Sequence, residues 1–196
     1  MILHSRPDAR THPLAFAAAQ ARRTRTGHRL VVAASGVTAV VTHAGGWLFD
    51  RVMAGWEVVV LVDEREDRRP LDILGAHVVD LESALVSRTR VPLPQAIAVD
   101  PQLYSADSRV RDGITEIFEY RLIEEVTMWG RPFADAVRVP FVPVQHQLSA
   151  AARTFKQAAL SAAGSRATPA GAAELFLTRA GNSRPRAMRD LAPVSR

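Results

Sequence analysis

The 196-residue sequence contains no cysteine. The chain therefore has no disulfide framework, no thiolate metal site and no cysteine nucleophile, and a cytoplasmic location is the default expectation. No apolar run approaches the roughly 20 residues that are needed to cross a bilayer. The opening Met-Ile-Leu-His-Ser-Arg-Pro-Asp also lacks the apolar centre of a signal peptide. The sequence thus predicts no membrane partner.

Lysine is nearly absent, because Lys156 is the only lysine among 25 basic residues. The net charge of +5 is uneven: the two arginine-rich ends, residues 1–30 and 164–196, are basic, and the part between them is net acidic. Basic ends on an acidic body are typical of a regulatory protein that contacts another protein or nucleic acid. A general excess of Arg and Ala explains the same pattern without a partner. Nucleic acid is not favoured, because phosphate-binding faces usually cluster their charge on one ordered element.

The chain is long enough for one domain with a substantial core and short for two. Residues 1–28 are predicted to be a peripheral N-terminal segment, and residues 29–163 an α/β domain. From Gly164 the sequence is rich in Arg, Ala and Pro, which predicts a flexible, disordered tail over residues 164–196.

Short apolar runs punctuated by glycine, proline and acidic residues predict the strands of the domain. The run over 57–62 is continuous rather than alternating, which is typical of a strand buried on both faces of a parallel sheet. The fold class expected is a single Rossmann-like α/β domain with a mainly parallel sheet of four or five strands, flanked by helices. The predicted strands are 30–34, 57–62, 76–81 and 96–99, with an edge strand or extended segment over 137–144, and the main predicted helices are 107–129 and 145–163.

The segment Val37–Thr42 fits two interpretations. Its β-branched residues favour a strand, whereas the spacing of its apolar residues fits a long helix that starts near Ser35 and passes through the pair Gly45-Gly46. Glycine inside a helix costs about 1 kcal/mol relative to alanine. We therefore favour the strand, with the glycine pair opening a helix behind it.

Two groups of residues are candidates for ligand binding. Gly45 and Gly46, with His43 beside them, would bring free backbone N–H groups of a helix start close to a phosphate or carboxylate. Asp63 and Glu64 follow the predicted central strand, at the edge where open parallel sheets bind ligands. Together they predict a site for a small anionic, nucleotide-like ligand. The plain alternatives are a glycine turn made for packing and a solvated charged loop.

No catalytic motif is visible. The glycines form neither a Gly-x-Gly-x-x-Gly fingerprint nor a P-loop, and no pair of histidines has the spacing of a zinc site. Ser35 lacks the first glycine of a nucleophile elbow. The sequence thus assigns no catalytic residue, metal ligand or cofactor, and the ligand and the oligomeric state stay open.

The stretch from Thr42-His43-Ala44-Gly45-Gly46 to the acids after residue 62 resembles the nucleotide-sugar segment of two-domain glycosyltransferases. The resemblance implies a nucleotide-sugar ligand, with His43 and the glycine pair near the diphosphate. It also implies Asp50 near the ribose and Asp63 or Asp67 near the sugar. In this sequence Trp56-Glu57 stands where that family usually has a proline.

Overall fold

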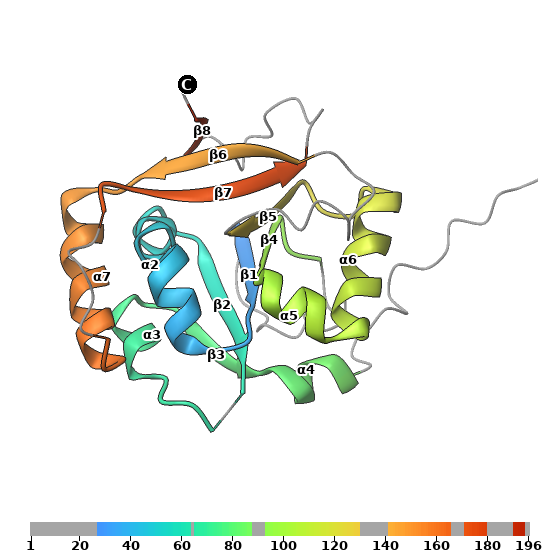
Figure 1. Ribbon diagram of the computed structural model, residues 1–196, viewed down its shortest axis with the longest axis horizontal. Coiled ribbons are helices and arrows are strands. Elements are labelled where there is room, and N and C mark those ends of the chain that lie inside the picture. Colours follow the sequence, from blue (N-terminus) through green and yellow to red (C-terminus); the bar gives the residue numbers. More distant parts are fainter. Residues whose placement is uncertain are drawn as a thin grey trace, which may run out of the picture.

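A computed structural model describes most of the chain (Figure 1). The described residues are 27–63, 65–87, 93–129, 141–165, 171–179 and 190–194. No helix among them is both long and apolar enough to span a membrane.

The described residues form one mixed sheet of eight strands in the order β3-β2-β1-β4-β5-β7-β6-β8. The first five strands of this order are parallel, and β7, β6 and β8 extend the sheet by antiparallel pairing. The strands are β1 (Arg29–Ala33), β2 (Glu57–Val62), β3 (His77–Asp80), β4 (Ala96–Val99), β5 (Glu125–Trp129), β6 (Phe141–Gln147), β7 (Ala173–Arg179) and β8 (Leu191–Pro193).

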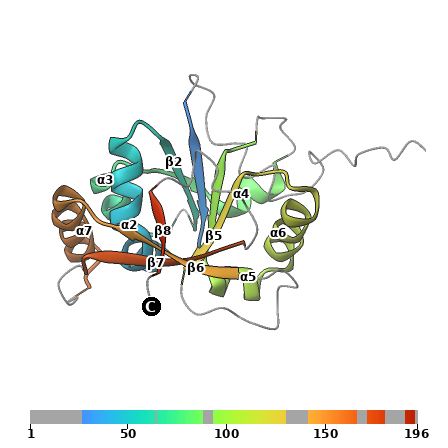
Figure 2. The ribbon, with the colours of Figure 1, turned by 90° about the horizontal axis from the view of Figure 1, so that it is seen from above.

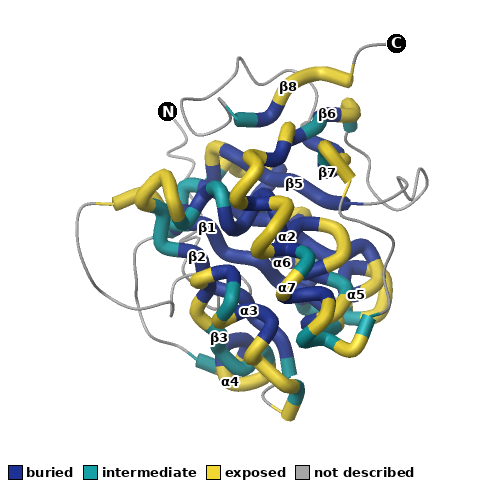
Figure 3. Tube along the Cα trace, turned by 90° about the vertical axis from the view of Figure 1, so that its left-hand side faces the viewer, coloured by how far each residue is buried: buried dark blue, intermediate teal, exposed yellow. Residues whose placement is uncertain are grey.

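Helices cover both faces of the sheet (Figures 1 and 2). One face packs against α2, α3 and α7, and the other against α4, α5 and α6. The helices are α2 (Val37–Met53), α3 (Arg69–Ile73), α4 (Leu81–Val86), α5 (Pro101–Ala106), α6 (Ser108–Tyr120) and α7 (Ala150–Ala162). Figure 3 shows β1, β2 and β5 largely buried among helices whose outer sides are exposed, whereas β3 at the edge of the sheet is less buried.

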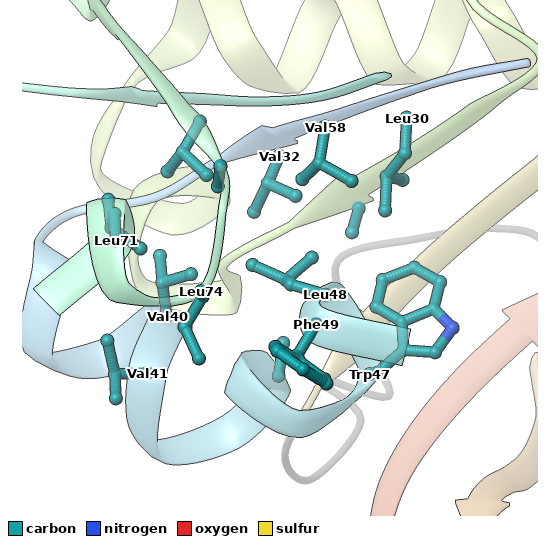
Figure 4. Packing of buried hydrophobic residues seen from close by; sticks show 14 of the residues in the cluster. Leu30, Val32, Val40, Val41, Trp47, Leu48, Phe49, Val58, Leu71 and Leu74 are labelled. Carbon is teal, nitrogen blue, oxygen red and sulfur yellow. The ribbon is translucent and has the colours of Figure 1, made fainter. Parts of the chain in front are cut away.

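Alternate residues of the central strands supply the two cores. Leu30 and Val32 of β1 face α2, whereas Val31 and Ala33 face the opposite layer. This alternation explains why β1, β2 and β4 are apolar along most of their length: both of their faces are buried. Figure 4 shows the core under α2, where Trp47 and its neighbours on the helix pack against β1 and β2.

The helix interpretation of Val37–Thr42 is confirmed, and the strand interpretation is wrong. α2 runs through the glycine pair, which lies in its middle rather than at its start. A Cβ atom on Gly46 would lie 2.2 Å from Leu148 Cδ2, so close packing requires glycine there and outweighs the cost in helix propensity.

The expected sheet of four or five mainly parallel strands is also wrong, because the sheet is mixed and has eight strands. One missed strand is β5, which the sequence placed inside a helix over 107–129. α6 ends at Tyr120, Arg121 adopts a left-handed conformation with φ 51°, and the chain then enters the sheet. Similarly, the predicted helix over 145–163 begins only at Ala150, after Ser149 caps its N-terminus, and its first residues belong to β6.

The predicted disordered tail contributes two strands. β7 lies between β5 and β6, and β8 pairs with β6, so residues 173–179 and 191–193 belong to the sheet. Residues 166–170, 180–189 and 195–196 lie outside the described residues, as does most of the N-terminal segment predicted over 1–28.

Candidate functional site

The order in which the chain adds parallel strands to the sheet reverses between β1 and β4. From β1 the chain proceeds to β2 and β3 on one side, whereas β4 and β5 lie on the other. In open α/β sheets, ligands bind beside the carboxyl ends of the two strands at such a point. Here β1 is followed by Ser35 and β4 by Asp100.

Ser35 and Asp100 join the two strand ends. The Ser35 N–H donates a hydrogen bond of 3.0 Å to Asp100 Oδ2, and the Ser35 hydroxyl donates to the same oxygen. The other carboxylate oxygen accepts the Gln102 N–H at 2.9 Å and so caps α5. Asp100 is 2% exposed, whereas Ser35 is exposed. A buried carboxylate therefore fixes an accessible hydroxyl at the edge of the sheet.

His43 lies on α2, and its exposed ring stacks on Trp129, the last residue of β5, with 6.4 Å between ring centroids and 12° between planes. Partial burial and then the positive charge of Lys156 lower the pKa of His43, while the Asp100 carboxylate acts in the opposite direction. The imidazole is thus mostly neutral at pH 7, and it offers one hydrogen-bond donor and one acceptor.

The loop after β2 places two carboxylates on this side of the sheet. Asp63 forms an exposed ion pair with Arg65 at 2.7 Å, and the hydrogen bonds from Arg65 lower the pKa of Asp63 to about 2. Glu66 Oε2 accepts the Val37 N–H at 2.8 Å. Because Val37 is the first residue of α2, the Glu66 carboxylate already occupies the positive end of this helix.

The residues predicted from the sequence as one site are therefore not gathered in one place. His43 and Asp63 lie where the parallel strands end, whereas Gly45 and Gly46 are buried inside α2. Glu64 lies outside the described residues. Ligand binding by these residues stays a prediction.

Asp50 and Asp67, which the glycosyltransferase resemblance implied near ribose and sugar, have partners within the chain. Asp50 Oδ2 is 2.8 Å from His146 Nε2 and accepts the Ser149 N–H at 3.1 Å, and these hydrogen bonds lower the pKa of Asp50. Asp67 accepts the Arg69 N–H at 2.9 Å.

A second group of charged residues is buried between α2, β5 and the turn before β8. Arg51 Nη2 donates to both carboxylate oxygens of Glu125 at 3.0 Å, and its Nε donates to Asp190 at 2.7 Å. The guanidinium carbon lies 4.9 Å from the ring centroid of Trp47 and 4.1 Å from that of Trp56. Among the described residues, Arg51 Nη1 is buried without a hydrogen-bond partner. No sequence motif marks this group.

Glu125 makes folding stability depend on pH. Burial raises its pKa from 4.5 to about 7, although Arg51 acts against this shift. A carboxyl whose pKa is higher in the folded state contributes stability that is complete below its unfolded pKa and is lost as the pH rises through the folded pKa. We expect Glu125→Gln to remove this loss, which is at most about 3 kcal/mol between roughly pH 5 and pH 8.

The measurement is urea denaturation of both proteins across this pH range. His43, whose pKa is lowered, changes stability in the opposite direction near pH 6, so the difference between wild type and variant is the quantity to compare. Parallel curves for the two proteins would show that Glu125 does not titrate in this range.

No group of three or more His, Cys, Asp or Glu side chains within the described ranges is placed to hold a metal ion.

Solved structures of two deacetylases are similar to this chain. The zinc-inhibited form of teicoplanin deacetylase Orf2 is 13% identical, covers 79% of this chain and 100% of its own, and has a TM-score of 0.54. The A40926 pseudoaglycone deacetylase Dbv21 is 17% identical, covers 80% of this chain and 99% of its own, and has a TM-score of 0.52. No family model matches the sequence, and no curated protein matches it significantly. The chain thus shares its α/β fold with these deacetylases.

Proposed function

We propose that this protein binds a small polar ligand beside the carboxyl ends of β1 and β4, with Ser35 and His43 as the contacting residues. The observation that carries the proposal is the accessible Ser35 hydroxyl, held by the buried Asp100 where the order of the strands reverses. The order β3-β2-β1-β4-β5 supports the Rossmann-like relationship predicted from the sequence, and ligands of such sheets bind at this point.

The charges at this edge favour a ligand that supplies hydrogen-bond donors. Glu66 fills the positive end of α2, Asp63 lies at the end of β2, and His43 is mostly neutral. Hydroxyl and amide groups suit such acceptors better than a further anion does. The two structural neighbours named above are deacetylases, enzymes that remove an acetyl group. We therefore propose a neutral sugar or acetamido sugar, and the nucleotide-like anion and the nucleotide-sugar predicted from the sequence are the alternatives.

A thermal-shift screen tests the proposal with N-acetylglucosamine, other neutral sugars, nucleotides, nucleotide-sugars and inorganic phosphate. A ligand at 100 times its dissociation constant adds about 2.7 kcal/mol of stability, which is easily detected. We expect a shift with a sugar, and we expect Ser35→Ala to reduce it. Ser83→Ala, at an exposed position on α4, is the matched control and is expected to retain it.

A shift with nucleotides alone would instead support the anionic ligand. The absence of any shift, or an equal loss of binding in the two serine variants, would contradict the proposed site. The alternative function is then a regulatory protein that contacts protein or nucleic acid through its arginine-rich ends, which lie mostly outside the described residues. Binding of DNA in an electrophoretic mobility-shift assay, with an affinity that falls as the salt concentration rises, would support that function.

A further inference from the structure

Lys156, the only lysine of the chain, lies on α7 and is 5% exposed. Its ammonium group forms an ion pair with Glu174 of β7, with 2.6 Å between Nζ and Oε1. Glu174 is 4% exposed. A buried ion pair rarely adds net stability, because desolvation of the two charges offsets their attraction. Its position in the fold is therefore more informative than its strength.

The pair lies against the middle of α2. Lys156 Nζ donates to the Thr42 carbonyl at 2.7 Å, while the two Glu174 carboxylate oxygens accept the N–H groups of Gly46 and Trp47 at 2.9 and 2.8 Å. In a regular α-helix the Thr42 carbonyl and the Gly46 N–H bond to each other. Here both groups have a partner from the ion pair, so Lys156 and Glu174 bracket this turn of the helix.

Gly46 leaves space for the approach of Glu174. A Cβ atom on Gly45 would lie 3.5 Å from Lys156 Cγ, and one on Gly46 would lie 3.3 Å from Glu174 Oε1, in addition to the close contact with Leu148. The contact at Gly45 is an ordinary van der Waals distance, whereas the contact at Gly46 is tighter, so Gly46 leaves room for Glu174. The sequence analysis predicted that a ligand approaches the glycine pair, and this stays a prediction; the groups that lie against the pair in the structure are side chains of the protein itself.

His43 belongs to the bracketed turn, since it follows Thr42 and precedes Gly46. Its ring leaves the helix toward Trp129 at the end of β5. Beside the larger effect of partial burial, the Lys156 ammonium lowers the pKa of His43 and the Asp100 carboxylate raises it.

We infer that Lys156 and Glu174 are positioning residues that fix the turn of α2 carrying His43 and set the charge state of its imidazole for ligand binding. This inference rests on the proposed function for the role of His43, but the geometry and charge of the histidine are measurable without a ligand. Lys156 supplies the positive charge that acts on His43. Glu174 holds the backbone N–H groups of α2 and, as the partner of Lys156 in the ion pair, reduces the effect of that charge.

Opposite effects of the two residues on His43 provide the test. In NMR titrations of the full chain, we expect Lys156→Met to raise the pKa of His43, because a positive charge is removed. We expect Glu174→Gln to lower it, because Lys156 then loses the carboxylate that is paired with its positive charge. Arg153→Met, at an exposed position of the same helix, is the control and is expected to leave the titration unchanged. Loss of packing alone would move the pKa in the same direction in both variants.

Glu174→Gln keeps an oxygen that can accept a backbone N–H, so it still provides a test if Lys156→Met does not fold. An unchanged His43 titration in the folded variants, or shifts of the same sign, would overturn the inference. The ligand found in the screen is then titrated against the same proteins, with weaker binding expected for Lys156→Met. A failed screen combined with opposite pKa shifts would contradict the proposed function and leave the positioning of His43 established.

Discussion

Replacing Arg51 by alanine is expected to lower the free energy of unfolding by about 3–5 kcal/mol, because it leaves a buried carboxylate without its cation. Glu125 is fully buried, and Arg51 is 2% exposed and also binds Asp190. The loss should be smaller at acid pH, where Glu125 becomes neutral. Urea denaturation near pH 8 and near pH 5 measures both effects.

Arg109→Ala is the matched control for this prediction. Arg109 also binds two carboxylates, those of Glu82 and Asp107, but its side chain is 40% exposed. Exposed ion pairs contribute about 0–1 kcal/mol. Equal losses in the two variants would show that burial does not govern the contribution of Arg51.

Gly46→Ala is expected to cost about 1–3 kcal/mol or more through overpacking, even though alanine is the better helix former. The new methyl group would lie 2.2 Å from Cδ2 and 2.6 Å from Cγ of Leu148, both well inside van der Waals contact. Gly45→Ala is the control, since its methyl group would meet Leu74 Cδ1 at 3.3 Å. We expect this variant to lose much less stability under the same denaturation conditions.

A double substitution identifies the cause of the loss. Leu148→Ala removes the atoms that the new methyl group would meet, so Gly46→Ala with Leu148→Ala should be less destabilised than the sum of the two single variants. Strict additivity would show that the contact with Leu148 does not cause the loss.

The central part of the fold was predictable from the sequence. The strands over 57–62 and 96–99 are confirmed with the same bounds, and those over 30–34 and 76–81 within two residues. Most residues of these strands are apolar because they lie between the two layers of helices, and that property is visible in a single stretch of sequence.

The later strands and the charged groups between them were not predictable in the same way. Glu125 lies on β5, whose residues are all buried, and Glu174 is a buried residue of β7; their charges argue against burial when the sequence is considered alone. Their partners Arg51 and Lys156 are 74 and 18 residues away along the chain. Similarly, Asp100 is 65 residues from Ser35. Local pattern analysis does not reveal contacts at such separations.

The insertion of β7 between β5 and β6 has a consequence for the order in which the protein is assembled during translation. Glu174 and Phe176 of β7 reach into the core made by the first third of the chain, where Phe176 lies against Trp47 at 4.9 Å between ring centroids. During translation, the middle turn of α2 and Trp47 therefore stay incompletely covered until these residues have been synthesised. Contacts between distant parts of a chain form late, so residues of β7 complete the packing of α2, the first helix of the described residues.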